Sequence, residues 1–302
     1  MRPTSRFPSS SLARRVMLQS VLPLAALQSV SRPPAAIAAA PSFFERLRAR
    51  YILLRPGETS FEAAGMVDSN PINKGQAERG LTAKGREQVL RSADEMRKAG
   101  ITSPVIFYDN GVRATQTADI LGQALGVPRR DIEPEFRWLE ARGLGALDGT
   151  DLREAVTKLR AMDTLDIDNA PEPSDDGTPA DSVNEVYSRM GNTIRKIEST
   201  YGAGDFVVVG GDATVLSVFA AAACGADLRE HSKFELPPGS WYDLRELVRS
   251  YKEGTFTPAE RIPSWLPSDQ EAKRGRDVIN DMGEGVFSES AAGSCLCCEC
   301  FR

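Results

Sequence analysis

Two arginines, Arg55 and Arg113, are the residues of this chain best suited to bind an anion. Arg55 closes the apolar segment "YILL", and Arg113 opens a helical pattern that follows a second apolar segment, "VIFY". In an open α/β sheet the ligand site lies beyond the carboxyl ends of the strands. Two guanidinium groups brought together there would offer forked donors to a phosphate or a carboxylate. We therefore predict that both arginines line an anion pocket.

The segments around these arginines predict an α/β three-layer sandwich, with a mostly parallel central sheet and helices on both faces. Continuous apolar runs are typical of strands buried on both sides, and helical patterns separate them. The last predicted strand contains prolines, which favours an edge position. The predicted strands lie in "RARYILLRPGE", "SPVIFYDN", the start of 132–149, "DFVVVGG" and "LPPGSWYDLREL".

The helical segments have recognisable ends. Thr82 can cap a helix in "LTAKGREQVLRSADEMRKAG" that stops at Gly100. Its expected buried positions are Val89, Leu90, Ala93 and Met96. Further helices are predicted in "VRATQTADILGQAL", "DLREAVTKLRAM", "SVNEVYSRMGNTIRKIESTYG" and "TVLSVFAAAACG".

Residues 1–38 have the composition of a removable targeting segment. The first 44 residues contain five arginines and no acidic residue, and Arg14-Arg15 precede the uncharged stretch "VMLQSVLPLAALQSV". This stretch is shorter than the ~20 residues of a membrane span. It resembles a twin-arginine signal cleaved after Ala38, which favours the thylakoid lumen of a chloroplast, with a bacterial periplasm as the alternative. Because the formal net charge is already −5, we expect no nucleic-acid partner.

Beyond a globular domain at 39–253 we expect an extension, 254–302, that is rich in Pro, Gly and charge and is disordered from about 267. Cys224 lies in an apolar run and is expected in the core. The other cysteines lack the spacing of a structural zinc site, so an oxidisable tail is favoured over metal binding. They are Cys295, Cys297, Cys298 and Cys300.

Motifs between about residues 48 and 250 resemble those of the histidine phosphatase superfamily, also called the phosphoglycerate mutase-like family. "LLRPGETSF" is similar to its R-H-G-E-T strand end, "GLTAKGREQ" to its L-T-x-x-G-x-x-Q helix start, and "YDNGVRATQTADIL" to its S-P-x-x-R-A-x-Q-T-A segment. "LEARGLGALDG", "DSVNEVYSRM", "VVVGGDATVLSVF" and "FELPPGSWYDLREL" follow in the family's order. The resemblance implies the same fold and phosphoryl transfer through a histidine, without a metal or another cofactor.

Carried over by position, the resemblance assigns phosphate binding to Arg55 and Arg113, with Glu58 as a motif neighbour and Arg142 as the loop arginine. The position of the attacking histidine holds Pro56. The nitrogen of a proline is locked in the backbone and has no lone pair to attack phosphorus. The nucleophile of the family is therefore absent at this position.

The other reactive positions also differ from the family. The second histidine falls on Asp212, or on Gly211 if the turn is aligned one residue earlier. A carboxylate there adds negative charge where the phosphate would gain charge in the transition state. The acid/base glutamate falls on Ala141, and the adjacent Glu140 replaces it only if the loop shifts register.

His231 is the only histidine of the chain. It lies between the predicted apolar helix and the last strand, and no spacing places it beside the arginines. We expect it to be a surface loop residue.

These substitutions predict a pseudoenzyme with no catalytic residue, metal or cofactor. Its vestigial phosphate pocket would contain Arg55, Arg113, Glu58, Glu140 and Arg142, with Asp212 and Glu58 neutralising the first two arginines. We expect a binding or assembly module with a protein partner, such as a thylakoid membrane complex facing the lumen.

Two alternatives stay open from the sequence. One is a phosphatase or phosphoglycerate mutase-like hydrolase with an altered site, in which Asp212 acts as nucleophile or base. The other is a binder of phosphate or a small phosphorylated molecule, which would use the two arginines without catalysis.

Overall fold

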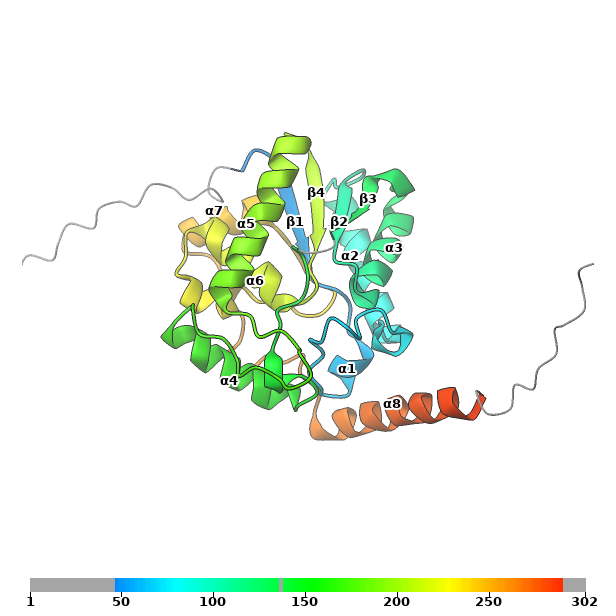
Figure 1. Cartoon of the computed structure of the whole chain (residues 1–302). Helices are drawn as coiled ribbons and strands as arrows, with labels where there is room; N and C mark the ends of the chain where they lie inside the picture. Colours follow the sequence, from blue (N-terminus) through cyan, green and yellow to red (C-terminus); the bar gives the residue numbers. More distant parts are fainter. Residues whose placement is uncertain (1–46, 136–137, 290–302) are drawn as a thin grey trace, which may run out of the picture. The chain divides into compact units, whose positions relative to one another are not determined.

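A five-stranded sheet lies between two layers of helices (Figure 1). The computed structural model describes residues 47–135 and 138–289, all within the compact unit Ala40–Arg302. The predicted targeting segment and the four clustered cysteines lie outside these residues. The domain boundaries at 38 and 253 therefore stay predictions.

The sheet has the order β3-β2-β4-β1-β5, and its first four strands are parallel. Only β5, at the edge next to β1, runs antiparallel. This confirms the predicted mostly parallel sheet and its proline-flanked edge strand. The strands are β1 (Arg50–Leu54), β2 (Val105–Tyr108), β3 (Ile132–Pro134), β4 (Asp205–Val209) and β5 (Trp241–Asp243).

Alternate residues of the central strands point into two separate cores. Tyr51 and Leu53 of β1 pack on the face covered by α5 and α6, whereas Ile52 and Leu54 pack on the face covered by α2 and α3. Both faces are buried, which explains why the strands read as unbroken apolar runs. The helices are α1 (Ser60–Ala63), α2 (Ala83–Lys98), α3 (Val112–Leu125), α4 (Leu152–Leu165), α5 (Val183–Thr200), α6 (Ala213–Cys224), α7 (Leu244–Lys252) and α8 (Asp269–Glu289).

Helix α2 begins as predicted but buries a narrower face. The Thr82 hydroxyl accepts the Gly85 N–H at 2.9 Å, and Val89, Ala93 and Met96 are buried. Leu90, which was predicted to be buried, is 48% exposed. Because successive helix residues are rotated by about 100°, Leu90 points away from the face that Val89 presents to the sheet.

Two glycines bring the end of β1 against the start of α2. A Cβ atom on Gly57 would clash with the backbone of Gly85, and one on Gly85 would clash with the backbone of Glu58. The loop after β1 therefore approaches the helix backbone directly, which fixes the direction in which the chain leaves Arg55 and Pro56.

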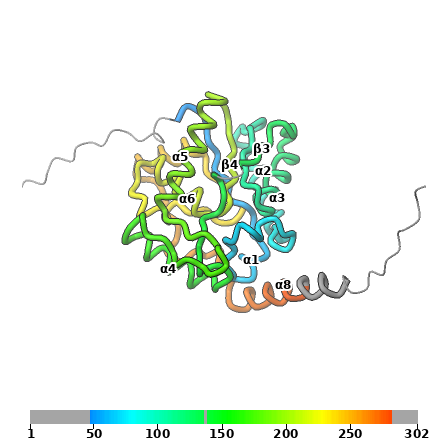
Figure 2. The backbone as a smooth tube through the Cα atoms, viewed as in Figure 1, coloured from blue at the N-terminus to red at the C-terminus, as the bar shows by residue number. Residues whose placement is uncertain are grey.

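Residues 269–289 form a helix where disorder was predicted. Helix α8 lies beside α1 (Figure 2). It packs there through small residues: Ala272 is 6% exposed, and Gly275 lies against the backbone of Ala63 and Ala64. The Arg276 guanidinium also donates to the Ala64 carbonyl at 2.9 Å. A helix that packs through Ala and Gly has little apolar signal, so its composition suggested disorder.

Candidate functional site

The predicted site residues meet at the carboxyl ends of the parallel strands. Arg55 directly follows β1, Arg113 lies in the first turn of α3 after β2, and Asp212 precedes α6 after β4. The three residues line one pocket of about 100 Å³. The parallel sheet thus brings together residues that are far apart in the sequence.

The guanidinium group of Arg55 is held by several contacts within the protein. Arg55 is 3% exposed and donates at 2.6 Å both to the Leu236 carbonyl and to Glu62 Oε1. Glu235 Oε1 lies 3.7 Å away, and the Trp265 ring covers the guanidinium at 4.0 Å. Nη1 and Nη2 therefore each already donate to the protein, so a phosphate would compete with these bonds.

Glu62, not Glu58, is the main acidic partner of Arg55. Its Oε2 accepts the Thr59 N–H at 2.9 Å in a capping box that starts α1, which leaves Oε1 for the arginine. Glu58 instead bonds to Thr82 at 3.0 Å and to Lys84 at 2.6 Å, both at the start of α2. The predicted pairing of Glu58 with the site arginines is therefore wrong.

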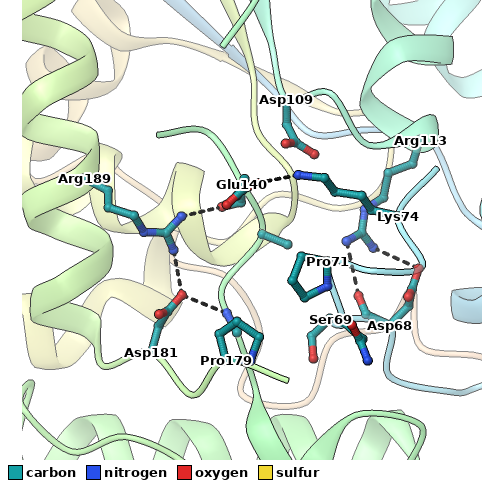
Figure 3. A pocket seen from close by; sticks show the side chains of 13 residues that line it. Asp68, Ser69, Pro71, Lys74, Asp109, Arg113, Glu140, Pro179, Asp181 and Arg189 are labelled. Atoms are coloured by element: carbon teal, nitrogen blue, oxygen red, sulfur yellow. Dashed lines mark hydrogen bonds and ion pairs between the residues drawn. The ribbon is translucent and has the colours of Figure 1, made fainter. Parts of the chain in front are cut away.

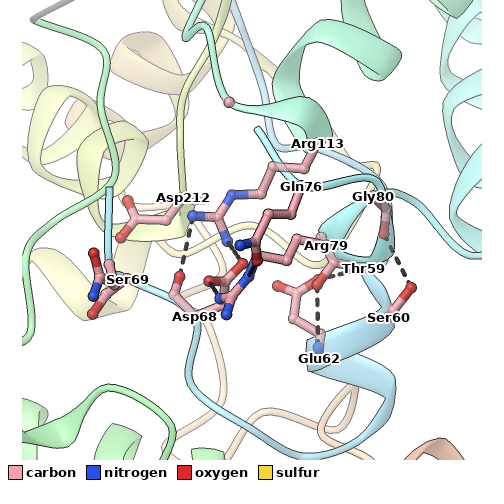
Figure 4. Close-up of polar contacts among 12 residues, drawn as sticks. Thr59, Ser60, Glu62, Asp68, Ser69, Gln76, Arg79, Gly80, Arg113 and Asp212 are labelled. Carbon is pink, nitrogen blue, oxygen red and sulfur yellow. Dashed lines mark hydrogen bonds and ion pairs between the residues drawn. The ribbon is translucent and has the colours of Figure 1, made fainter. Parts of the chain in front are cut away.

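Arg113 is likewise held by an acid of the protein. Its guanidinium lies 3.7 Å from Asp68 Oδ2 and donates to the Asp68 carbonyl at 3.2 Å (Figure 4). Arg79 pairs with the other carboxylate oxygen of Asp68. Burial alone would lower the pKa of Arg113, but the charges of Asp68, Asp212 and other nearby acids outweigh it and raise the pKa.

Asp212 is the N-terminal cap of α6. Its Oδ1 accepts the Val215 N–H at 3.0 Å, and its Oδ2 accepts the Arg142 N–H at 3.1 Å. The predicted neutralisation by Asp212 is therefore indirect: its charge acts on Arg113, but the structure records no ion pair between them. At Gly211, the alternative position for the second histidine, a Cβ atom would clash with the Ala141 backbone, so the turn has no room for a side chain.

The remaining positions that the sequence analysis interpreted as degenerate have structural contacts. Pro56 is buried, and its carbonyl accepts the Gly239 N–H at 2.8 Å. Ala141 packs against the Gly211 turn. Glu140 pairs with Lys74, and its carbonyl accepts a bond from Arg189 at 3.1 Å. Glu140 thus lies on a second pocket, not on the pocket that Arg55 lines.

Most charged groups around the first pocket are paired with one another. The guanidinium groups that face it belong to Arg55 and Arg113, whereas its acids are Glu62, Asp68, Asp212 and Glu235. Arg79 also pairs with Asp68, and Arg160 with Glu235, so arginines outside the lining offset two of these acids. An anion would therefore have to displace existing ion pairs at the place where the sequence predicted it to bind.

Arg142 is among the residues that line this pocket, but its side chain belongs to a buried ionic cluster. The guanidinium, 1% exposed, makes two bonds to the Asp163 carboxylate at 2.7 and 2.9 Å. It also donates to the Asp181 carbonyl at 2.8 Å. Arg142 was predicted to belong to a vestigial phosphate site. Its loop lies close to that site, but its side chain points into the core.

His231 completes this cluster, which corrects the predicted surface position. It is 5% exposed, with Nε2 at 3.1 Å from Asp163 Oδ2 and Nδ1 at 2.8 Å from Ser217 Oγ. The order Ser, His, Asp is that of a hydrolytic triad, but Ser217 is 1% exposed and lines neither the pocket that Arg55 lines nor the pocket that Glu140 lines. The sequence carries no signal for this cluster because its members come from separate segments.

A second pocket of about 120 Å³ shares Asp68, Ser69 and Arg113 with the first (Figure 3). Its lining includes Asp109, which follows β2 and is 2% exposed. Burial is the largest effect on this carboxyl and raises its pKa, although the Gly111 N–H, Arg113 and Lys74 act in the opposite direction. The sequence analysis did not single out Asp109, although it stands at a strand end.

The described residues contain no cluster of three or more His, Cys, Asp or Glu side chains arranged to hold a metal ion. Within the same part of the chain, no helix has the length and apolar character needed to cross a membrane.

The fold and the converging strand ends define an α/β protein of the phosphoglycerate mutase-like class. The sequence model of the histidine phosphatase superfamily (branch 1) matches residues 51–254. Because this match covers more than half of the chain, the protein belongs to that superfamily.

Curated relatives and solved structures agree with this assignment. Two proteins named probable phosphoglycerate mutase GpmB match: that of Salmonella typhi is 36% identical over 96 residues (32% of this chain, 39% of the relative). That of Proteus mirabilis (strain HI4320) is 33% identical over 122 residues (40% and 50%), so the chain spans half or less of these relatives. The solved structure of mycobacterial hydrolase 1 superposes with a TM-score of 0.51 at 19% identity, covering 64% of this chain and 89% of that one. At this identity the superposition shows the fold alone.

Proposed function

We propose that this protein is a catalytically inactive member of the superfamily, kept as a binding or assembly module. The observation that carries the proposal is the state of Arg55, whose guanidinium is bonded to Glu62 and the Leu236 carbonyl and covered by Trp265. The resemblance to the family places the attacking histidine at Pro56, which has no nucleophilic side chain.

The geometry gives less support to the alternative in which Asp212 is the nucleophile or base of a hydrolase. Each carboxylate oxygen of Asp212 accepts a backbone N–H, so the group stabilises the start of α6 and the loop at Arg142. A nucleophile needs a lone pair directed at phosphorus and a nearby base that activates it. The GpmB relatives are named as probable phosphoglycerate mutases. For this chain, mutase activity belongs to the alternative to be tested.

A role as a phosphate binder is opposed by the acids of the pocket. Arg55 and Arg113 each have a carboxylate within 4 Å, at 2.6 and 3.7 Å. A phosphate would have to displace these contacts, which separates Glu62 from Arg55 and leaves Asp68 paired with Arg79 alone. We therefore favour a protein partner over a small phosphorylated ligand.

The leader supports export as part of the proposal. The twin-arginine pattern and the small residues before Pro41 favour the thylakoid lumen, with a bacterial periplasm as the alternative. There the protein would act as an auxiliary of a membrane complex. Affinity purification of the mature protein from its compartment tests this: one stoichiometric complex supports it, and recovery of the protein alone opposes it.

Inactivity is tested with purified protein lacking residues 1–38 and a generic aryl phosphate, with an active member of the superfamily as positive control. We expect no phosphate release above the buffer blank and no phosphate-dependent rise in Tm. The variant Glu62→Gln/Glu235→Gln, which frees Arg55 of negative charge, is expected to gain a phosphate-dependent rise. Turnover that disappears in Asp212→Asn would overturn the pseudoenzyme in favour of the altered hydrolase.

A further inference from the structure

The second pocket, next to Arg113, has an unusual balance of charges. Its basic side chains each have an acidic partner in the lining: Arg113 with Asp68, Lys74 with Glu140, and Arg189 with Asp181. Among the described residues of this lining, Asp109 is the acid that has no ion pair. Asp68 is shared between Arg113 and Arg79, so Asp109 is the one described acid of this lining whose charge is not offset by a direct ion pair.

Half of the Asp109 carboxylate is bonded and half is not. Oδ2 accepts the Gly111 N–H at 3.0 Å, which joins the end of β2 to the start of α3. Oδ1 is buried and has no hydrogen-bond partner among the described residues. Figure 3 shows the carboxylate directed toward the part of the pocket where Lys74 and Glu140 meet. A buried carboxylate oxygen without a donor is costly, so this oxygen favours a ligand that donates a hydrogen bond.

We propose that this pocket binds a primary ammonium group, with Asp109 Oδ1 as its main acceptor and the Glu140 carboxylate as a second contact. The polarity is the opposite of that of a phosphate site, because the unpaired group of the lining is a carboxylate. The volume of about 120 Å³ is close to that of an engineered cavity of about 150 Å³ that holds benzene, so an ammonium with a short alkyl stem fits. Pro71, Pro179 and Ala141 provide apolar surface for such a stem.

The ammonium has two possible sources. It is either a free alkylamine or the lysine side chain of a protein partner, whose four-carbon stem carries a compact charge with three donors. The shared chemistry is a monosubstituted ammonium in both cases. The inference goes beyond the proposed function, because an inactive phosphatase site neither requires nor excludes an ammonium site.

Titration of the protein without its leader with ethylammonium chloride tests the proposal. We expect a saturable rise in Tm, because a ligand that binds only the folded state stabilises it. Tetramethylammonium has the same charge but no N–H donor, and it is expected to have no effect. Equal shifts with both cations, or no saturable shift with ethylammonium, would overturn the proposal without the use of any variant. Neither result bears on phosphatase activity, which is measured separately.

Two substitutions locate the site. Asp109→Asn keeps the shape and is expected to weaken ethylammonium binding roughly ten- to a hundred-fold, because a bond to a charged group is lost. Asp94→Asn removes an exposed acid of α2 and is the matched control, with unchanged binding expected. Binding that persists unchanged in Asp109→Asn would place the amine elsewhere and contradict the assignment.

The pH dependence and a peptide arm complete the test. A proton on Asp109 competes with the ammonium, so the affinity for ethylammonium is expected to rise with pH. The charged groups that act on this carboxyl are Arg113, Lys74 and Glu140. A lysine-containing peptide that binds more tightly than ethylammonium, and loses binding when the lysine is acetylated, indicates a protein source. Tighter binding of the free amine indicates a small-molecule source. Affinity that falls as the pH rises would contradict the role of Asp109.

Discussion

Asp163 and Asp109 are two buried carboxylates of one chain with opposite surroundings. Both are 2% exposed, so burial alone disfavours the charged form of each. Asp163 accepts two bonds from Arg142 and faces His231. These partners outweigh burial and lower its pKa. Asp109 has only the Gly111 N–H and two more distant cations, and its pKa is raised.

This difference separates a structural role of a buried carboxylate from a binding role. All the strong donors around Asp163 come from the protein, so the cluster links α4, the loop at Arg142 and the 3₁₀ helix Leu228–Phe234 into one unit. Asp109 lies on a pocket wall with one oxygen unpaired. The first acid stabilises the fold, and the second keeps an unmet bonding capacity that a ligand can satisfy.

The largest expected effect is that of Asp163→Asn. Removing this charge leaves the Arg142 guanidinium buried without its partner, which typically costs about 3–5 kcal/mol. Urea unfolding followed by circular dichroism measures the free energy of unfolding. Asp94→Asn, which breaks an exposed pair with Arg97, is the control and is expected to cost less than about 1 kcal/mol. A loss in Asp163→Asn no larger than that in the control would remove the structural role of the cluster.

A smaller effect, of opposite direction, is expected for Asp109→Asn in the absence of amines. The substitution removes a charge that has no ion pair, and the asparagine oxygen still accepts the Gly111 N–H. Removal of an uncompensated buried charge is neutral or stabilising. The same unfolding experiment near neutral pH checks this, and a destabilisation as large as that of Asp163→Asn would show that Asp109 is bonded as fully as Asp163.

Most of the fold could be predicted from the sequence because its signals are local. The apolar runs of β1, β2 and β4 and the Thr82 cap of α2 depend on neighbouring residues, and they lie where the patterns placed them. Helix α8 was missed because it packs through Ala272 and Gly275, which give no apolar stripe.

The site was only partly predictable because its contacts are distant in the sequence. The convergence of Arg55 and Arg113 follows from the order of strands and helices. Asp163 and His231 are 68 residues apart, and no spacing rule joins them. The pairing of Arg55 with Glu62 had a readable local signal, the capping box "TSFE", which frees one oxygen of the glutamate for a nearby donor.

The smallest expected effect is the difference between the two acids in their dependence on pH. The pKa of Asp163 is lowered by folding, so its contribution to stability is complete above its ordinary value of about 3.9 and is lost as the pH falls through the folded value. The pKa of Asp109 is raised, so its contribution is complete below about 3.9 and is lost as the pH rises through the folded value. With increasing pH, the stability of the wild type relative to Asp163→Asn should therefore rise, and that relative to Asp109→Asn should fall. Urea unfolding of the three proteins in steps from about pH 3 to pH 7 measures both differences. If both stability differences change in the same direction with pH, the pKa values of Asp163 and Asp109 are not shifted in opposite directions, which contradicts the comparison.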